Sequence, residues 1–335
     1  MRIAVVGSYG VGLTMRTSHF PELGETLTGG RLSSGHGGKG SNQAVAARRL
    51  GADVSLLTTV GDDAPASAAH DLWQNEGIDA SGVLTVPGEA TMTGIIMVDD
   101  DAENRIVIAP GALDHFSPED VRSHAETIEA ADALVVCLEI PMPTACEALR
   151  IGHAAGVLTI LNPAPACPVP SEVFAHVDVI TPNLTEATTL LRGHADSVSI
   201  DDDSRPDLGG ETPADANSSP EQLATTIHGR TGARVVLTLG GDGSVVVDSH
   251  GASRIPPVPP TRLVDTTGAG DSFTAALAVS LVEGEDLHTA AGRAAAVGAH
   301  VVAHDEVIPA LPYRSDLSDR LWPPVGESTA SDAHL

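Results

Sequence analysis

Short apolar segments alternate along the chain with longer segments in which apolar residues recur every three or four positions. The short segments are almost continuously apolar, which is typical of parallel strands buried on both faces. They predict strands at 3–6, 54–60, 134–138, 158–161, 177–181, 235–239 and 245–247. The periodic segments predict helices near 42–50, 66–75, 118–130, 144–155 and 184–191. This alternation predicts an α/β fold with a mostly parallel sheet that helices cover on both faces.

Two segments depart from this alternation. Residues 25–33 and 93–109 have the pattern of half-exposed antiparallel strands, and the second contains a polar turn at 99–104. Antiparallel strands with one solvated face commonly form small sheets outside a parallel core. We therefore expect a small β lid built from about 10–35 and 90–109.

The stretch at about 193–220 is rich in Asp, Ser, Pro and Gly and has no apolar period. Such a composition cannot bury a core, so it predicts a mobile acidic insertion at the surface. The carboxylates at 201–203 leave a calcium loop open as an alternative, although the ligand spacing of an EF-hand is absent. We expect one domain over 1–314, followed by a C-terminal tail at 315–335.

Composition and charge narrow the partners. The chain has 335 residues and a formal net charge of −27, which disfavours nucleic acid and anionic membrane surfaces. The three cysteines, Cys137, Cys146 and Cys167, form no C-x-x-C pair, as expected for reduced thiols. The first residues are strand-like, and no apolar run approaches the ~20 residues of a membrane span. These features predict a cytoplasmic protein that binds neither nucleic acid nor membrane.

The run VDTTGAGDSF at 264–273 carries the strongest chemical signal. Asp271 opens an apolar stretch that predicts a helix, so Gly268, Ala269 and Gly270 would lie at the helix N-terminus. Unpaired N–H groups at such a terminus bind anions. A neighbouring carboxylate can take a proton from a hydroxyl while the amides hold a phosphoryl group. The alternative is a glycine-rich turn that only caps a helix.

A second glycine run, GHGGKGSNQA at 35–44, also enters an apolar helix. It contains Lys39, the only lysine in the chain. A compact ammonium on a flexible stem can reach a small polar ligand. A lysine in a surface loop is the alternative.

Other nucleotide and metal motifs fit poorly. Gly38 and Lys39 are followed by Gly40, where a Walker P-loop needs Ser or Thr. The run GSYGVG at 7–12 lacks the spacing of a dinucleotide fingerprint, and no G-x-S-x-G supports a nucleophilic hydrolase. His300 and His304, one helical turn apart, leave a metal site open as an alternative to a polar helix end.

The two glycine runs together resemble the two signature regions of the ribokinase-like (PfkB) carbohydrate kinases. Further segments match in the same order, namely LEIP at 138–141, NPAPA at 162–166, NLTE at 183–186 and TLGGDG at 238–243. The resemblance covers nearly the whole chain. It implies a ribokinase-like three-layer αβα sandwich with a small β lid. It also implies an enzyme that transfers the γ-phosphate of ATP to a hydroxymethyl group of a small sugar, with ribose as the leading acceptor.

The resemblance also implies roles for individual residues. Asp271 would be the general base, with the amides of Gly268, Ala269 and Gly270 as the anion hole. The sugar would be held by Gly38, Lys39, Asn42 and Glu139. ATP with Mg²⁺ would be bound by Asn183, Glu186, Thr238, Gly240, Gly241 and Gly243. Asp265 and Thr267 match the family's K⁺ loop, and pairing of lids implies a homodimer.

Four positions depart from the family pattern. Gly10 and Gly12 stand where ribokinases have Asn and Asp to grip the sugar, so another pentose, a deoxy sugar or a polyol stays open as the acceptor. Glu306 replaces a usual glycine in the cation loop, and Ala295 replaces a His near the adenine. A catalytically silent sensor of a sugar or nucleotide is the other class of function. A nucleoside kinase is disfavoured, because the 2% aromatic content leaves few rings to stack a base.

Overall fold

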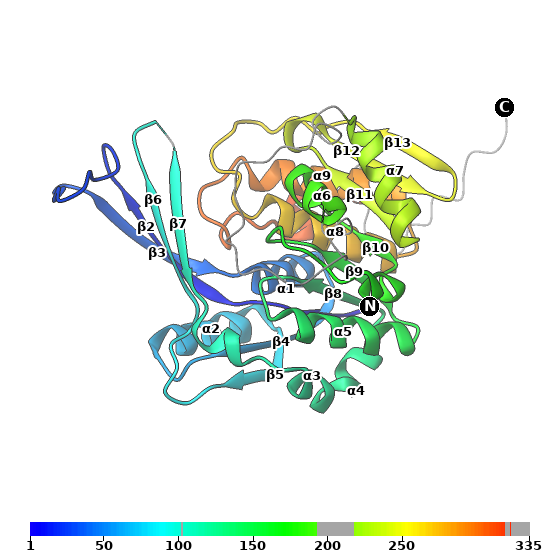
Figure 1. The fold of residues 1–335 in the computed structure, drawn as a ribbon, viewed down its shortest axis with the longest axis horizontal. Coiled ribbons are helices and arrows are strands. Elements are labelled where there is room, and N and C mark those ends of the chain that lie inside the picture. The colour runs from blue at the N-terminus through cyan, green and yellow to red at the C-terminus, as the bar shows by residue number, and fades with distance from the viewer. Residues whose placement is uncertain (102, 193–217, 319–321, 323–335) are drawn as a thin grey trace, which may run out of the picture.

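The computed structural model describes residues 1–101, 103–192, 218–318 and 322. Its main sheet has nine strands in the order β13-β12-β11-β10-β9-β8-β1-β4-β5 (Figure 1). All neighbours are parallel except the pairs that β12 makes with β11 and β13. The strands are β1 (Arg2–Val6), β4 (Asp53–Val60), β5 (Asp79–Thr85), β8 (Ala133–Cys137), β9 (Leu158–Asn162), β10 (Val179–Ile180), β11 (Arg234–Thr238), β12 (Ser244–Asp248) and β13 (Gly251–Ile255).

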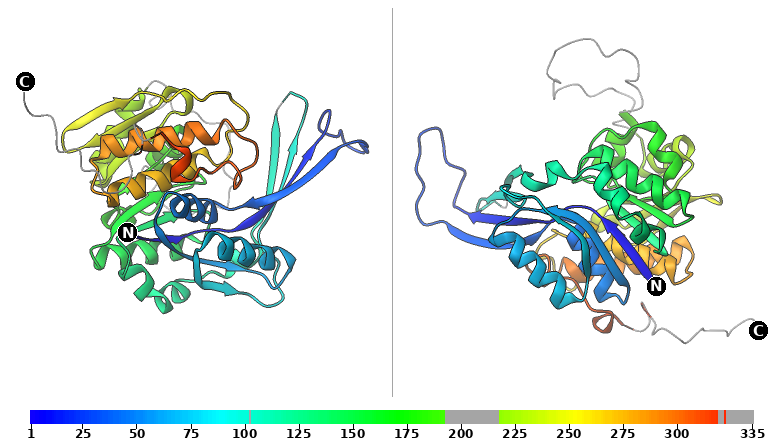
Figure 2. Two further views of the ribbon diagram at one scale, coloured as in Figure 1. Left: turned by 180° about the vertical axis from the view of Figure 1, so that it is seen from behind. Right: turned by 90° about the horizontal axis from the view of Figure 1, so that it is seen from below.

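Helices cover both faces of this sheet, which makes three layers (Figures 1 and 2). One layer holds α1 (Lys39–Arg49), α2 (Ala64–Glu76), α8 (Ala269–Val282) and α9 (Leu287–Val301). The other holds α3 (Pro118–Ser123), α4 (Ala125–Glu129), α5 (Met142–Ala154), α6 (Leu184–Arg192) and α7 (Pro220–Thr231). Because side chains alternate along a strand, Ile3 and Val5 enter one apolar core while Ala4 and Val6 enter the other. The predicted αβα sandwich is confirmed.

Short 3₁₀ helices complete the secondary structure. They are η1 (Gly111–His115), η2 (Ser171–His176), η3 (Gly240–Asp242) and η4 (Arg314–Asp316). In the described ranges, no helix combines the length and the apolar character needed to cross a bilayer.

A second sheet projects from the sandwich and forms the lid (Figure 2). Its four strands are ordered β3-β2-β6-β7, with bounds β2 (Gly10–Arg16), β3 (Arg31–Gly37), β6 (Thr93–Val98) and β7 (Asn104–Ala109). The β6–β7 hairpin confirms the prediction for 93–109. The strand predicted at 25–33 is wrong, because Gly29 has φ 92° and the chain becomes extended only from Arg31.

Several further elements differ from the sequence-based expectation, and β5 was not predicted as a strand. The helix predicted at 118–130 is two helices, because His124 leaves helical geometry with φ −116° and ψ 22°. Helix α7 was not predicted, and its N-cap is Ser219, whose side chain forms a capping box with Gln222. It therefore begins at the end of the predicted insertion, and 193–217 lies outside the described residues, as does most of the predicted tail. Edge strand β13 was missed because its sequence, GASRI, has no apolar pattern.

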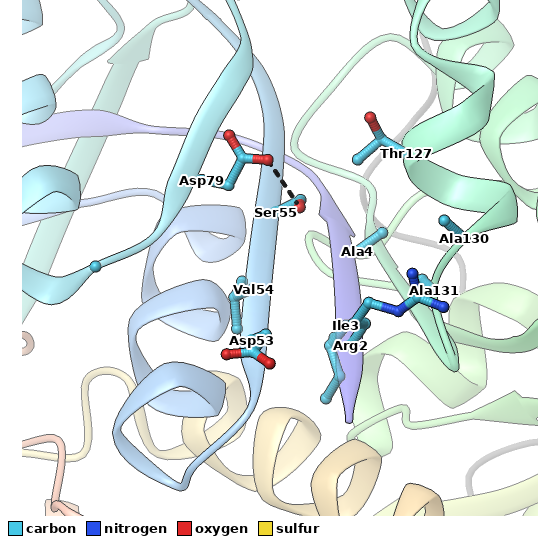
Figure 3. Close-up of a pocket in the computed structure, with 11 residues that line it drawn as sticks. Arg2, Ile3, Ala4, Asp53, Val54, Ser55, Asp79, Thr127, Ala130 and Ala131 are labelled. Carbon is cyan, nitrogen blue, oxygen red and sulfur yellow. Dashed lines mark hydrogen bonds between the residues drawn. The ribbon is translucent and has the colours of Figure 1, made fainter.

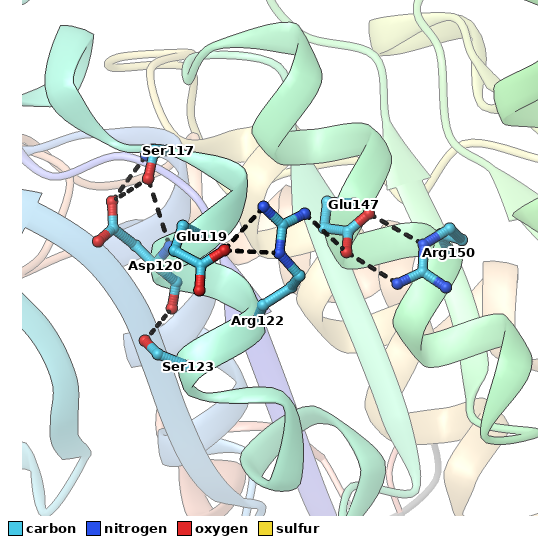
Figure 4. A network of polar contacts seen from close by, with 7 residues as sticks. All are labelled: Ser117, Glu119, Asp120, Arg122, Ser123, Glu147 and Arg150. Atoms are coloured by element: carbon cyan, nitrogen blue, oxygen red, sulfur yellow. Dashed lines mark hydrogen bonds and ion pairs between the residues drawn. The ribbon is translucent and has the colours of Figure 1, made fainter.

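An ion-pair network ties α3 to α5 at the surface (Figure 4). Arg122 bonds Glu119 within its own helix and reaches Glu147 on α5 at 3.2 Å. Glu147 also pairs with Arg150 at 2.8 Å, and these groups lower the pKa of its carboxyl, chiefly through the Arg150 hydrogen bond. Exposed pairs of this kind contribute little to stability. The network connects two surface helices.

A close backbone contact joins β1 to α1. A Cβ on Gly40 would lie 2.6 Å from the Cα of Gly7, so only glycine allows this approach. The N–H of Ser41 donates to the carbonyl of Ser8 at 2.8 Å across the same contact. The first turn of α1, with Lys39 and Asn42, is thereby held against the carboxyl end of β1.

Substituting Gly40→Ala tests this contact. We expect the free energy of unfolding in urea to fall by about 3 kcal/mol, because the methyl group must displace backbone atoms. Gly229→Ala in α7 is the matched control, since no atom lies within 4 Å of its added Cβ. There we expect a gain of about 0.5–1 kcal/mol from helix propensity. Equal effects of the two substitutions would contradict a packed contact.

Candidate active site

The predicted anion hole lies at the N-terminus of α8. Gly268 is the N-cap, with φ 79°, and a Cβ there would lie 2.7 Å from Cγ1 of Val307. Helical hydrogen bonding starts at its carbonyl, which accepts from the N–H of Ser272 at 2.9 Å. The N–H of Ala269 makes a long 3.3 Å contact with the carbonyl of Thr266. The helix start is as predicted, with one of its three amides directed back into the turn.

Asp271 occupies the first turn of α8 and is 6% exposed. Its Oδ2 accepts from Nδ2 of Asn42 at 2.8 Å, and its Oδ1 accepts from Nε2 of Gln43 at 3.3 Å. Burial raises the pKa of this carboxyl, while the charge of Lys39 and the Asn42 hydrogen bond oppose the rise. The carboxylate therefore binds a proton more readily than an exposed aspartate, which suits a general base.

Lys39 lies among carboxylates at the start of α1. Burial disfavours its charge, but Asp271 and Glu139 outweigh burial and raise the pKa of the ammonium. The Oε2 of Glu139 accepts from the hydroxyl of Ser8 and from the N–H of Lys39, the latter at 3.0 Å. The structure thus brings together Lys39, Asn42, Glu139 and Asp271, all of which the sequence predicted to act on the acceptor.

The lid strand β2 presents no side chain at the two departure positions. A Cβ on Gly10 would lie 2.5 Å from Cε of Met92, and one on Gly12 would lie 3.5 Å from Cδ1 of Ile96. Gly38, with φ 88°, packs its Cα directly against the backbone of Tyr9 beside Gly10. Met92 therefore crowds the Gly10 position with its side chain and its carbonyl, whereas the Gly12 position has only an ordinary contact with Ile96.

The N-x-x-E motif forms a reciprocal cap at the start of α6. Glu186 accepts from both the backbone N–H and the side-chain amide of Asn183, each at 2.8 Å. The N–H of Glu186 returns a hydrogen bond to Oδ1 of Asn183 at 2.9 Å. Burial raises the pKa of Glu186, opposed by the Asn183 hydrogen bonds and by the charge of Lys39. The motif therefore has a local structural role, whatever it binds.

The predicted nucleotide loop lies beside this cap. Thr238, at the end of β11, forms a β-bridge with Asn183. The following turn requires glycine twice, because Gly240 has φ 57° and a Cβ on Gly243 would lie 2.2 Å from the carbonyl oxygen of Ile255. Gly241 lies between them in η3, where no atom approaches its Cβ position. The residues predicted to bind ATP are thus grouped at one edge of the sheet.

The predicted cation loop is closed by local hydrogen bonds. Oδ1 of Asp265 accepts from the N–H and the hydroxyl of Thr267 at 2.8 and 2.7 Å. The N–H of Val264 donates to the carbonyl of Val302 at 2.8 Å, which places the loop against the end of α9. Nearby, Glu306 has φ 63°, the only positive φ outside glycine among the described residues. The departure at Glu306 is therefore a backbone position that favours glycine.

Sequence reasoning missed two polar residues of the site. Gln43 and Asn162 are both buried, and Nε2 of Gln43 donates to Oδ1 of Asn162 at 3.0 Å as well as to Asp271. Both residues lie inside quoted motifs, but nothing in a linear motif shows that α1 and β9 meet at Asp271. The one feature of the sequence that could have revealed them is that each is an amide residue in a motif composed mostly of small residues.

The alternative metal site at the end of α9 is not supported. His300 and His304 stack their rings with centroids 4.5 Å apart. Within the part of the chain that the structure describes, no group of three or more His, Cys, Asp or Glu side chains could hold a metal ion.

A cavity of about 450 Å³ lies at the opposite edge of the sheet (Figure 3). It is lined at the amino ends of β1 and β4 by residues that include Arg2, Asp53 and Asp79, and Asp79 bonds Ser55 at 3.3 Å. Ligand sites of open α/β sheets lie at the carboxyl ends of strands, so this cavity is separate from the site around Asp271.

The fold and the site together define a sugar kinase of the phosphotransferase class. Residues 2–314 match the model of the pfkB family carbohydrate kinases, and the chain belongs to this family. The predicted family and enzyme class are confirmed.

Relatives and solved structures agree with this class. The chain is 36% identical to a ribokinase of Haemophilus influenzae, covering 84% of this chain and 85% of that protein. It is 32% identical to a deoxyribokinase of Salmonella typhi, covering 88% and 90%. It is 37% identical to a bifunctional ribokinase/ribose-5-phosphate isomerase A of Fructilactobacillus sanfranciscensis, of which it spans only 48%. The structure of an Arabidopsis thaliana ribokinase with ribose and ATP superimposes with a TM-score of 0.80 at 27% identity, covering 93% and 96%.

The left-handed backbone of Glu306 yields a stability prediction. Glu306→Gly should raise the free energy of unfolding by about 0.5–1 kcal/mol, because relief of the positive φ exceeds the added freedom of the unfolded chain. Glu22→Gly is the control, since Glu22 is also exposed but has no positive φ, and it should lower stability. Urea unfolding measures both, and a loss of stability in Glu306→Gly would refute the strain.

Proposed function

We propose that this chain phosphorylates the hydroxymethyl group of ribose with the γ-phosphate of ATP. The observation that carries the proposal is the contact of Asp271 with Asn42 at the N-terminus of α8, beside the charge of Lys39. The named relatives that act on ribose support the choice of acceptor. An intact base and glycine turn argue against a catalytically silent sensor.

In the proposed reaction this chain positions two substrates and moves one proton. Lys39, Asn42 and Glu139 hold the sugar, with Gly38 giving close backbone approach. Asp271 accepts the proton of the attacking hydroxyl, and the amides of Gly268 and Gly270 stabilise charge on the transferring group, while that of Ala269 is directed into the turn. ATP lies along the turn at 238–243 and the cap at 183–186. Phosphoryl transfer depends mainly on such positioning and charge stabilisation.

Two metal ions belong to the proposal. Glu186 is a buried carboxylate of the kind that Mg²⁺ prefers, and both of its oxygens accept from Asn183 in this structure; Mg²⁺ held there would neutralise phosphate charge. Asp265 and Thr267 provide oxygen atoms for K⁺, and Glu306 adds a carboxylate to the neighbouring segment. All these donors are the hard oxygen ligands that both ions prefer.

We further propose a cytoplasmic homodimer that pairs through the lid. Leu32, Ile95 and Val107 lie on one face of the lid sheet and are 64%, 52% and 70% exposed. An exposed apolar face of this kind favours burial against a partner. The free cysteines fit a reducing compartment.

A deoxy sugar is the second candidate acceptor. The observation that favours it is that Gly10 and Gly12 present no polar side chain and have the side chains of Met92 and Ile96 as neighbours. A sugar hydroxyl facing this wall would lose its hydrogen bonds to water without a side-chain partner. An acceptor that lacks such a hydroxyl avoids this cost.

Comparing ribose with 2-deoxyribose in a coupled ADP-release assay decides between the two acceptors. Gly12→Asp, which restores a carboxylate beside the sugar, should raise kcat/KM for ribose relative to 2-deoxyribose by about ten-fold. Ser34→Asp is the control, because exposed Ser34 pairs with Leu13 rather than Gly12 and so adds the same charge on the opposite face of the lid sheet. An unchanged ratio in Gly12→Asp would show that β2 does not contact the acceptor.

Asp271→Asn tests the general base. We expect kcat to fall by about 10²–10⁴, because the amide cannot accept the hydroxyl proton. The KM for ATP should stay near the wild-type value, since Asp271 is placed on the sugar side. The raised pKa of Asp271 also predicts that kcat is lost on acidification at a pH above the ordinary aspartate range. Retained turnover of Asp271→Asn would exclude this role.

A further inference from the structure

Two side-chain amides, those of Gln43 and Asn162, connect Asp271 to the backbone just after β10, and a third, that of Asn42, holds its other oxygen. Nδ2 of Asn162 donates to the carbonyl of Thr181 at 3.1 Å. Oδ1 of Asn162 accepts from Nε2 of Gln43 at 3.0 Å, and the same nitrogen reaches Oδ1 of Asp271 at 3.3 Å. Asn42 completes the set with its 2.8 Å bond to Oδ2. Asn42, Gln43, Asn162 and Asp271 are each at least nine-tenths buried, so water does not replace these contacts.

The two amides, those of Gln43 and Asn162, can donate their hydrogen bonds in only one favourable direction. A backbone carbonyl can only accept, so Asn162 must direct its NH₂ group toward Thr181. Its oxygen then faces Gln43, which must present its own NH₂ group in turn. A flipped Gln43 would place its oxygen against both Oδ1 of Asn162 and the Asp271 carboxylate, which is repulsive. The carbonyl of Thr181 therefore determines which atom of Gln43 meets Asp271.

The cost of this arrangement is visible in the same residues. Oδ1 of Asn42 and Oε1 of Gln43 are buried, and neither has a hydrogen-bond donor among the described residues. Unsatisfied buried acceptors are unfavourable for folding. Asn42 and Gln43 therefore lower the stability of the fold by leaving these two acceptors unpaired. What they provide in return is two N–H donors directed at the Asp271 carboxylate, which points to a functional reason for the arrangement.

We propose that Gln43 and Asn162 are positioning residues that orient the Asp271 carboxylate and keep it ionised for proton transfer. This inference rests on the proposed role of Asp271 as the base. With both carboxylate oxygens held by amides, the attacking hydroxyl meets a fixed acceptor lone pair. Asn162 acts through Gln43, because among the described residues its side chain hydrogen-bonds to Gln43 and Thr181 and not to Asp271.

The test measures kcat against pH for Gln43→Met and Asn162→Leu, which preserve side-chain size. Loss of an N–H donor destabilises the ionised carboxylate, so the acid limb should move up by about one pH unit in Gln43→Met. Plateau kcat should fall by about ten-fold or more, because the base is less well oriented. Lys39, Glu139, Glu186 and Cys137 also influence this region, and none of them is altered.

The double variant tests whether Asn162 acts through Gln43, which we call the amide relay, or whether each substitution simply disrupts the packing of the site. Because Asn162 acts through Gln43, we expect Gln43→Met/Asn162→Leu to show no further loss of kcat than Gln43→Met alone. Thr159→Val is the matched control on the same strand, β9. Thr159 is buried, and its hydroxyl donates to Oδ2 of Asp178 at 3.0 Å rather than to any member of the Gln43–Asn162 pair. It should lower the melting temperature and leave the pH profile unchanged.

Three results would overturn the inference. These are an unmoved acid limb in Gln43→Met, losses that multiply in the double variant, or an equal shift of the limb in Thr159→Val. If Gln43→Met does not fold, Gln43→Asn, which keeps the amide but shortens its reach, gives the same comparison. Asp271→Asn distinguishes this failure from that of the proposed function. If Asp271→Asn retains turnover, the base is misassigned, whereas its inactivity together with a normal Gln43→Met refutes the relay alone.

Discussion

Burial of several carboxylates around the only lysine of the chain is the constraint on which the site depends. Asp271, Glu139 and Glu186 each interact with the charge of Lys39, and burial raises the pKa of both Asp271 and Glu186. Removing like charges from water is unfavourable unless a cation and hydrogen bonds compensate. The glycine contact between β1 and α1 brings that cation to the carboxyl edge of the sheet, and the amides of Asn42 and Gln43 supply the hydrogen bonds.

The sequence allowed the layered fold to be predicted, because buried parallel strands such as 134–138 are almost wholly apolar and helices such as 144–155 are periodic. It predicted poorly where tertiary contacts outweigh local pattern. β3 carries glycines and serines, and it is extended because it pairs with β2 along its length. β13 is an exposed edge strand held by backbone hydrogen bonds to β12.

The candidate site divides in the same way. Asp271 and Lys39 were identified because each lies in a glycine run whose geometry has a chemical reason, and Asn42 was identified through the resemblance to the carbohydrate kinases. Gln43 and Asn162 were missed because their function arises only when α1, β9 and α8 meet, and their sequence neighbours give no sign of that meeting. Asn183 and Glu186 were predicted as ligand-binding residues, and the structure shows in addition that they form an ordinary helix cap.

The hydrogen bonds of Glu139 have a mechanical consequence for the lid. The hairpin of β2 and β3 leaves the sandwich after Ser8 and returns at Lys39, and the same carboxylate oxygen holds both points. Both ends of the hairpin are thus hydrogen-bonded to one oxygen atom of Glu139, which follows β8. A tilt of the hairpin would therefore act on the carboxylate that also holds the N–H of Lys39, which couples the lid to the lysine proposed to face the acceptor.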